Sequence, residues 1–360
     1  MVGILFFRRG DRKLANRFLS ITIFAVNMHL FYLMVLDTNL DNFFPFLLWV
    51  PYSFLTAVGP LILFYTKALT DQDFSIAKIS SKHFVPLAVE IGLQVIMIGQ
   101  GILSGELFYN TPLYFSVTPL IYFGAAASIF YYLRMSIRII NNHQAWVLSN
   151  FSNLKEVTLT WLRKLIVYYR LLLLVWVPFV AAFLLFFRFQ LQYLLIVLAL
   201  YLLILVLTYL TFWIGIEGFG RGNLTLIQAT KRKPENKNFN RLTAPEIQDF
   251  IERINQLMLV DKMYLNENLS LKELAQQLTA DPNLVSFVLN QHLKSNFHDF
   301  INRHRVEEVK HKMQDPQYAH LSLLGIAFES GFNSKTTFNR VFKQTTGLTP
   351  TQFQKRSLKK

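Results

Sequence analysis

The chain has 360 residues, of which 52% are apolar, 15% aromatic and only 16% charged, yet its formal net charge is +14. In a soluble globular protein about a quarter of the residues are charged, and a disordered basic protein contains few apolar residues. The composition therefore excludes both classes. The absence of cysteine excludes disulfides, thiolate metal sites and cysteine nucleophiles. We therefore expect a protein that meets both a lipid bilayer and a polyanion.

Charge is distributed unevenly along the chain. Residues 1–220 carry 15 basic and 9 acidic side chains, whereas the shorter stretch 221–360 carries 21 basic and 13 acidic ones, an ordinary soluble composition. This contrast predicts a membrane domain over 1–220, a basic juxtamembrane linker over 221–242 and a soluble domain over 243–360. We interpret the basic residues of the linker as contacts to anionic lipid in preference to DNA.

The uncharged runs of the first half have the length that a bilayer demands of a helix, about 20 residues. We predict six spanning helices, of which the third is interrupted by Glu90: 18–36, 42–66, 84–103, 107–133, 171–187 and 189–216. The apolar residues 1–7 are too short to span. They are either a short interfacial stub or the end of a spanning helix whose beginning is absent from this chain.

The basic residues of the connections predict the orientation, because lysine and arginine are retained on the cytoplasmic side. When alternate connections are assigned to opposite sides, thirteen of these residues fall on one side and only Arg188 on the other. We therefore expect a multi-pass protein of the inner (cytoplasmic) membrane whose two membrane-domain ends, and the whole soluble domain, face the cytoplasm.

Polar side chains within a span are costly and are candidates for a signal site. Glu90, with Gln94 one turn further on, leads this group, and Asn27 and His29 of the first predicted span follow. Two structural alternatives stay open: Glu90 reaches headgroups or pairs with His83, and His29 is a packing residue.

The soluble half has the periodicity of short amphipathic helices. A helix over 247–263 is followed by a pattern that occurs twice, a short helix, a turn and a second helix: 270–278 with 282–293, and 322–330 with 334–346. One helix over 297–314 separates the two patterns and would set their spacing. Two helix-turn-helix units are predicted.

Four small residues fit this interpretation. Ala275 and Ala327 stand at matching places, where two steeply crossing helices need a small side chain at their contact. Gly331 suits the left-handed position that ends a helix, and Ser334 can cap the helix that follows.

Residues 265–356 resemble the DNA-binding domain of AraC/XylS-type bacterial transcription regulators. The second unit, IAFESGFNSKTTFNRVFKQTTGLTPTQFQKR, is similar to the family signature almost position by position. The first unit departs from it: Thr279 and Lys294 stand where glycine is common, Asp281 where serine caps the helix, and Phe287 where a polar side chain is common. The whole chain resembles the membrane-integrated AraC-type regulators of Bacteroidetes genomes, which often have about seven spans.

The resemblance implies that the second helix of each unit enters the major groove of double-stranded DNA, with the two helices about 34 Å apart. Arg340 is then the best candidate for bidentate contact with guanine, whereas Lys335 and Lys343 would contact phosphate. Solvated surface positions are the alternative for each residue taken singly. The DNA-binding residues implied are Asn283, Ser286, Phe287, Asn290, Ser334, Lys335, Thr336, Asn339, Arg340 and Lys343.

No enzyme motif is present, neither a phosphate-binding glycine loop nor an HExxH zinc pair nor a Gly-x-Ser-x-Gly elbow, and we expect no cofactor and no metal. These patterns predict an all-α, membrane-integrated one-component transcription regulator. The alternative is a transporter-like or receptor protein whose cytoplasmic helices engage a protein partner. A small-molecule ligand, RNA polymerase and a second copy of the chain stay open as further partners.

Overall fold

The computed structural model describes residues 13–38, 40, 43–71, 73–105, 107–153, 159–189, 209, 213, 216–217 and 242–357. Within these residues the structure is helical and contains no strand, only an isolated antiparallel bridge between Phe151 and Ser270, which confirms the all-α prediction for this part of the chain. The predicted stub 1–7, the predicted linker up to residue 241 and most of the predicted span 189–216 lie outside the described residues.

The chain divides into two compact units, Met1–Asn141 with Thr160–Thr230, and Asn142–Leu159 with Lys231–Lys360. The end of helix α5 and the segment after it, which the charge pattern assigned to the membrane domain, thus pack with the C-terminal domain. Helix α5 itself is continuous and belongs to both units in turn.

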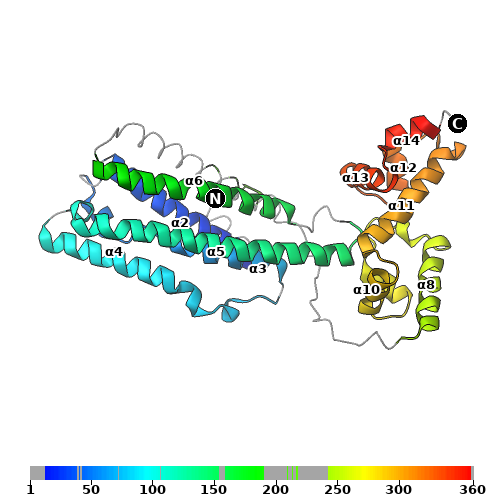
Figure 1. Cartoon of the computed structure of the whole chain (residues 1–360), viewed down its shortest axis with the longest axis horizontal. Coiled ribbons are helices and arrows are strands. Elements are labelled where there is room, and N and C mark those ends of the chain that lie inside the picture. The colour runs from blue at the N-terminus through cyan, green and yellow to red at the C-terminus, as the bar shows by residue number, and fades with distance from the viewer. Residues whose placement is uncertain are drawn as a thin grey trace. The chain divides into compact units, whose positions relative to one another are not determined.

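The first unit is built from long helices that lie roughly along one axis (Figure 1): α2 (Lys13–Asp37), α3 (Leu55–Thr70), α4 (Val85–Ser104), α5 (Pro112–Asn150) and α6 (Thr160–Phe189). Three helical stretches among the described residues, Lys13–Leu36, Ser81–Ser104 and Pro112–Asn150, are long and apolar enough to cross a membrane. Helix α3 is apolar but has only 16 residues. Six spans remain a prediction.

The predicted span 42–66 is not one helix in the structure. A short 3₁₀ turn, η2 (Pro45–Leu48), comes first, residues 51–54 have no regular structure, and α3 begins only at Leu55. Pro51 has no N–H to donate and its ring opposes a continuing helix. A run without charges therefore showed that the segment is apolar but not where its helix begins.

The helices of this unit pack closely against one another, and some of their outer surfaces are apolar. Helix α3 packs along α2, where the rings of Phe18 and Phe64 are 5.5 Å apart, and a side chain at Gly59 would come within 3.0 Å of the α5 backbone at Ile129. On α4, Val89 and Ile96 lie one heptad apart and are more than half exposed. Exposed apolar rows of this kind are typical of helices that face lipid or a partner.

The second unit holds the two predicted helix-turn-helix patterns. Its part from residue 242 onward begins with α8 (Ala244–Leu259) and the 3₁₀ turn η7 (Met263–Leu265). Six helices follow: α9 (Leu271–Gln277), α10 (Pro282–Gln291), α11 (Phe297–Gln314), α12 (Leu323–Glu329), α13 (Lys335–Thr346) and α14 (Pro350–Ser357). The 3₁₀ turn η8 (Pro316–Tyr318) lies between α11 and α12. Figure 1 shows them from yellow-green to red. Helix α8 ends four residues earlier than the predicted 247–263.

Helix α11 joins two separate hydrophobic cores. Its first half contributes Phe297, Phe300 and Ile301 to a core with α8, α9 and α10. Its second half contributes Val306 and Val309 to a core with α12 and α13. Each helix-turn-helix unit therefore has its own core, and one rigid element is common to both.

Candidate nucleic-acid interface

The first helix-turn-helix unit begins with a capping box. The Ser270 hydroxyl accepts from the Glu273 N–H at 3.3 Å, and the Glu273 carboxylate accepts from the Ser270 N–H at 2.8 Å. Leu271, Leu274 and Ala275 of α9 are buried, at the i, i+3, i+4 spacing of one helix face. The reciprocal bonds satisfy the free N–H groups that start this short helix.

The turn of this unit uses a non-glycine residue in a left-handed conformation. Thr279 has φ +52°, a value that places a β-branched side chain in strain. The Asp281 carboxylate accepts from the Asn283 N–H at 2.9 Å and so caps α10, in the place where the resemblance expects serine. The unit keeps its helices and turn despite both departures.

The predicted DNA-contacting residues of α10 are partly engaged within the domain. Asn290 is exposed, but its amide donates to the Ser286 carbonyl at 2.8 Å, and the Asn283 amide donates to Asp281 at 3.0 Å. Phe287 is half-buried against the first core, and its ring lies 5.6 Å from that of His292. Phe287 thus packs inward more than its predicted outward position implied.

The turn of the second unit depends on glycine. Gly331 has φ +89°, and a Cβ there would overlap the Tyr264 carbonyl oxygen and lie 3.0 Å from the Arg305 Nε. Both the backbone angle and the space therefore require glycine, as predicted. The Ser334 hydroxyl accepts from the Thr337 N–H at 3.3 Å, which confirms the predicted cap of α13.

Helix α13 separates an apolar face from a basic, exposed one. Phe338, Val341 and Phe342 are buried in the second core. The exposed residues of this helix include all five of its predicted DNA contacts, namely Lys335, Thr336, Asn339, Arg340 and Lys343. Three cationic groups on one exposed face, without a carboxylate on this helix, suit a phosphate backbone.

The Arg340 guanidinium contacts two neutral acceptors within the domain. One terminal nitrogen donates to the Gln344 side-chain oxygen at 3.5 Å, and the other lies 3.3 Å from Nε2 of His298 on α11. His298 is buried, and burial, helped by the positive charges of Arg340 and Arg305, lowers its pKa to about 4. At neutral pH the imidazole is uncharged and Nε2 can accept.

The face of α11 that carries His298 also contains a buried arginine. Arg305 donates from Nε to the Tyr264 carbonyl at 2.7 Å and from Nη2 to the Asn266 carbonyl at 2.8 Å and to the Ser152 hydroxyl at 3.1 Å. Burial lowers its pKa to about 10, so it stays charged near neutrality. Carbonyl oxygens from the loop after α8 thus stabilise a cation in the interior.

A second polar cluster holds α11 against the same loop. The Glu308 carboxylate accepts from the Tyr264 hydroxyl at 2.9 Å and pairs with Lys262 at 3.2 Å, and Lys312 lies 3.7 Å away. Burial raises the pKa of Glu308, but the bonds from Tyr264 and Lys262 and the two positive charges lower it below its usual value overall. Burial first, and the Glu308 contact second, raise the pKa of Tyr264.

Sequence reasoning missed His298, Asn302 and Arg305 as a group. They recur at the spacing i, i+4, i+7, and all three are at most 2% exposed. That spacing lines one face of a helix, so a polar row could have been noticed in a helix assigned only a spacing role. Their partner Ser152 lies 153 residues before Arg305 and gives no local signal.

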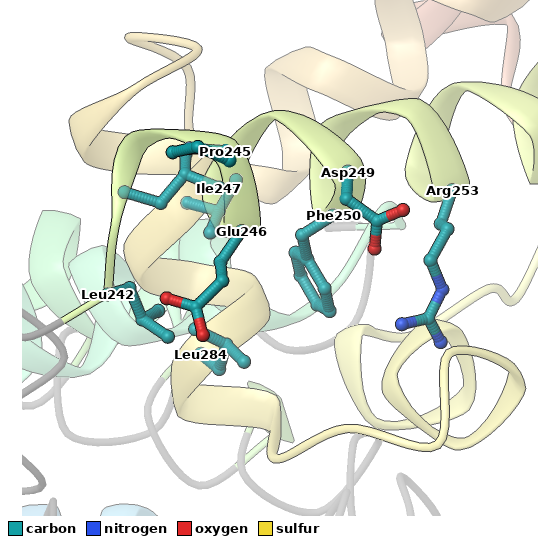
Figure 2. Close-up of a pocket in the computed structure, with 9 residues that line it drawn as sticks. Leu242, Pro245, Glu246, Ile247, Asp249, Phe250, Arg253 and Leu284 are labelled. Atoms are coloured by element: carbon teal, nitrogen blue, oxygen red, sulfur yellow. The ribbon is translucent and has the colours of Figure 1, made fainter.

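A pocket of about 390 Å³ lies between the start of α8 and α10 (Figure 2). The capping box of α8, in which Glu246 accepts from Thr243 at 2.7 Å, stands at its rim, and these bonds lower the pKa of Glu246. Its walls are Leu242, Pro245, Glu246, Ile247, Asp249, Phe250, Arg253, Leu284 and Val288. Three of these side chains, Glu246, Asp249 and Arg253, are charged, and the other six are apolar.

Glu90 and Gln94 come together in the first unit around the start of α3. The two Glu90 oxygens accept from the Leu55 and Thr56 N–H groups and from the Ser53 and Thr56 hydroxyls, at 2.5–3.2 Å. Gln94 accepts from the Tyr52 and Ser53 N–H groups and donates to the Ser53 carbonyl. These side chains satisfy an irregular stretch of backbone between helices, which a membrane interior tolerates only when it is buried.

The other two predicted membrane-site residues lie apart from this pair. Asn27 is exposed and donates to the Ile23 carbonyl of its own helix at 2.8 Å. His29 is buried edge-on to Tyr122, with ring centroids 5.5 Å apart. His83, the other partner considered for Glu90, instead lies 2.9 Å from the Tyr132 hydroxyl. Among the described residues no cluster of His, Asp and Glu could hold a metal ion.

Comparison with known proteins agrees with the geometry of the second unit. Residues 261–356 match the family model described as a helix-turn-helix domain. An uncharacterized HTH-type transcriptional regulator of Staphylococcus aureus strain COL is 31% identical over 103 residues, 29% of this chain and 13% of that protein. Counterparts from strains MSSA476 and N315 are 30% identical over the same shares.

The matched region is short in both directions. The chain spans 13% of the length of these relatives, and no solved structure matches it. The comparisons thus concern the C-terminal part alone. Residues 261–356 thus match a helix-turn-helix domain model, and this part of the chain is similar to a short part of HTH-type transcriptional regulators.

Proposed function

We propose that this chain is a membrane-integrated one-component transcription regulator, in which helices α10 and α13 bind promoter DNA under the control of a signal received by the membrane domain. One observation carries the proposal: a helix-turn-helix domain with an exposed basic helix, α13, follows a block of long apolar helices in the same polypeptide. Signal reception and DNA binding then need no second protein. The apolar helices supply the membrane anchor.

The DNA side of the proposal assigns different roles to the cations of α13. Arg340 reads a guanine through its planar fork, since its N–H groups match the O6/N7 edge. Lys335 and Lys343 contact phosphate, which fixes the position of the domain without reading sequence. On α10, Asn283, Ser286, Phe287 and Asn290 form a weaker reading surface, because their polar groups also bond within the domain.

The membrane side rests on the three candidate spans and on the exposed apolar row of α4. Glu90 and Gln94 form the buried polar centre of this unit, and a ligand that competes for the N–H groups of Tyr52 and Ser53 would change how α3 begins. We assign the signal site to this centre, with Asn27 and His29 as further candidates. A second copy of the chain and RNA polymerase remain proposed partners.

Specific DNA binding is tested with the full-length protein in nanodiscs and a library of duplexes with a randomised centre. We expect one sequence to be enriched and its affinity to fall steeply with salt. Arg340→Ala should relax the preference at one base pair by about 1–3 kcal/mol, whereas Lys343→Ala should weaken all sequences and reduce the salt slope by about one. Lys272→Ala, at an exposed position of α9, is the control for charge loss alone.

Enrichment of no sequence by the wild type would refute the regulator proposal and favour a protein partner for the helical domain. Membrane orientation is tested separately, because the chain has no cysteine of its own. Single cysteines at Val260 and Thr38, both exposed, should react with an impermeant maleimide from opposite sides of the membrane, Val260→Cys from the cytoplasm. Labelling of both from one side would contradict the topology.

Signal control is tested in cells by comparing transcripts of the full-length chain, a variant without residues 1–240, and Arg340→Ala. The deletion should change the same transcripts as the full-length chain, but more weakly and without a response to conditions, because it also lacks Ser152, which bonds within the helix-turn-helix domain. Arg340→Ala should lose these transcripts. If neither variant alters any transcript while uptake of a solute changes, the transporter-like alternative replaces the regulator.

A further inference from the structure

The segment that follows α5 is buried in the helix-turn-helix domain. Ser152 is 1% exposed, and both its N–H and its hydroxyl donate to the Leu269 carbonyl, at 3.3 and 2.7 Å. Phe151 forms the antiparallel bridge with Ser270, the cap of α9. We call residues 151–153 the clamp segment. It is held by backbone and side-chain bonds to residues more than a hundred positions away.

The clamp segment also bonds to all three residues of the polar row on α11, and of these the Asn302 amide donates to the Ser152 carbonyl at 3.5 Å. Arg305 donates to the Ser152 hydroxyl at 3.1 Å, and Nδ1 of His298 lies 2.9 Å from the Ser152 carbonyl oxygen. A carbonyl oxygen can only accept, so Nδ1 carries the hydrogen. In a neutral imidazole the other nitrogen, Nε2, then has a lone pair that can accept, and the Asn302 amide nitrogen lies 3.2 Å from it.

That lone pair faces Arg340. The distance from Nε2 of His298 to the terminal nitrogen of Arg340 is 3.3 Å, so the arginine donates to the imidazole. A continuous path of hydrogen bonds therefore runs from the Ser152 carbonyl through His298 to Arg340. The bond at one end fixes which nitrogen can accept at the other, as an outer partner fixes the tautomer of a metal-bound histidine.

We propose that His298 is a positioning residue for Arg340 and that the docked clamp segment sets it in place, so that release of the segment loosens Arg340 and weakens its preference for one base pair. The inference rests on the proposed function and names its regulation. Helix α5 is continuous from Pro112 to Asn150, and the clamp segment follows it directly. A shift of α5 would reach the clamp with no intervening loop.

The contacts of Arg340 favour positioning over blocking. Both acceptors, Nε2 of His298 and the Gln344 amide oxygen, are neutral, so the guanidinium keeps its charge for DNA. A blocking contact would be expected to use a carboxylate, which neutralises the cation. Arg340 is exposed, and its remaining N–H groups are free to reach a base edge.

The test uses the full-length protein in nanodiscs and the randomised duplex library. Ser152→Lys places a cation against Arg305 and should release the clamp, and His298→Phe keeps a ring but removes both nitrogens. We expect each to reduce, by about fivefold, the preference at the base pair that Arg340→Ala also affects, a change in the range of one lost hydrogen bond. The salt slope should stay unchanged, because phosphate contacts are not altered.

Two variants distinguish positioning from a general structural effect. His298→Gln can donate through its amide to Ser152 and accept from Arg340, so it should retain the preference. Ala145→Lys adds the same charge as Ser152→Lys at an exposed position of α5 and should behave as wild type. Loss of preference in His298→Gln together with an altered salt slope would show a structural role and overturn the proposal.

A cysteine pair covers the case in which Ser152→Lys or His298→Phe does not fold. Paired positions of an antiparallel bridge lie about 4.5–5.5 Å apart at Cα, within the range of a disulfide. Phe151→Cys with Ser270→Cys should regain about fivefold base preference on oxidation and lose it on reduction. Equal preference in both forms overturns the clamp. Absence of any selected sequence in the wild type overturns the proposed function instead.

Discussion

Gly331 and Gly325 lie six residues apart, and alanine at these two positions should have opposite effects on stability. At Gly331 the φ of +89° costs an alanine about 1–2 kcal/mol. Its Cβ would also overlap the Tyr264 carbonyl and press on Leu265 and Arg305, and such overpacking costs about 1–3 kcal/mol. We expect Gly331→Ala to lower the free energy of unfolding by about 2–5 kcal/mol.

Gly325 is the matched control. It lies inside α12, and its nearest neighbours to a new Cβ are the side chains of Leu321 and Ser322, at 3.5 Å, an ordinary contact. Alanine is favoured over glycine in a helix by about 0.8–1.0 kcal/mol. Gly325→Ala should therefore raise the free energy of unfolding by up to about 1 kcal/mol.

The assay is urea unfolding of a fragment 240–360, followed by circular dichroism at 222 nm. This fragment contains both cores of the helix-turn-helix domain and lacks Ser152 in the wild type and the variants alike. With a urea dependence of about 2 kcal/mol per molar, Gly331→Ala should move the midpoint down by about 1–2.5 M. A midpoint for Gly331→Ala within 0.2 M (about 0.5 kcal/mol) of wild type would refute the turn argument.

Three further predictions concern single positions. Thr279→Gly should raise the free energy of unfolding of the same fragment by about 1 kcal/mol, because φ is +52° there; a loss of stability would contradict this. Glu90→Ala should lower the thermal stability of the full-length protein in detergent by about 2–4 kcal/mol, since two N–H groups at the start of α3 lose their acceptor, whereas exposed Gln100→Ala should not. His298, whose pKa is depressed to about 4 from 6.5, stabilises the fold fully above pH 6.5 and less as the pH falls toward 4. The full-length protein should lose about 2 kcal/mol more between pH 7 and pH 5 than His298→Gln, measured by protease resistance in urea, and equal losses would speak against a buried neutral imidazole.

Local patterns predicted the helix-turn-helix domain well. The short helices α9 and α13, the left-handed Gly331 and the capping Ser334 all follow from spacing and side-chain chemistry within a few residues, and the structure confirms them. In a short amphipathic helix, the spacing of the apolar residues alone indicates which face is buried. Asp281 and Thr279 show that cap and turn survive substitution of the usual residue.

Contacts between distant segments could not be predicted in the same way. The bond between His298 and Ser152 joins residues 146 positions apart, and nothing in the composition of either segment indicates the other. Glu90 gave a different difficulty. A carboxylate within an apolar run drew attention to Glu90. The residues that donate to its oxygens, Ser53 and Thr56, lie within another uncharged run, and nothing in that run indicated that its helix is interrupted. The length of an apolar run indicates that a segment can cross a bilayer, but it does not indicate where the helix in that segment begins or ends.

Helix α11 fixes the distance and the relative rotation of the two helix-turn-helix units, because each of its halves belongs to a different core. One residue added between Ile301 and Val306 would turn everything from α12 onward by about 100° and advance it by about 1.5 Å. Helices α10 and α13 can change their surface residues one at a time, but the phase between them can change only in whole helical turns. If α10 and α13 bind DNA as proposed, the length of α11 therefore sets the spacing of the two half-sites.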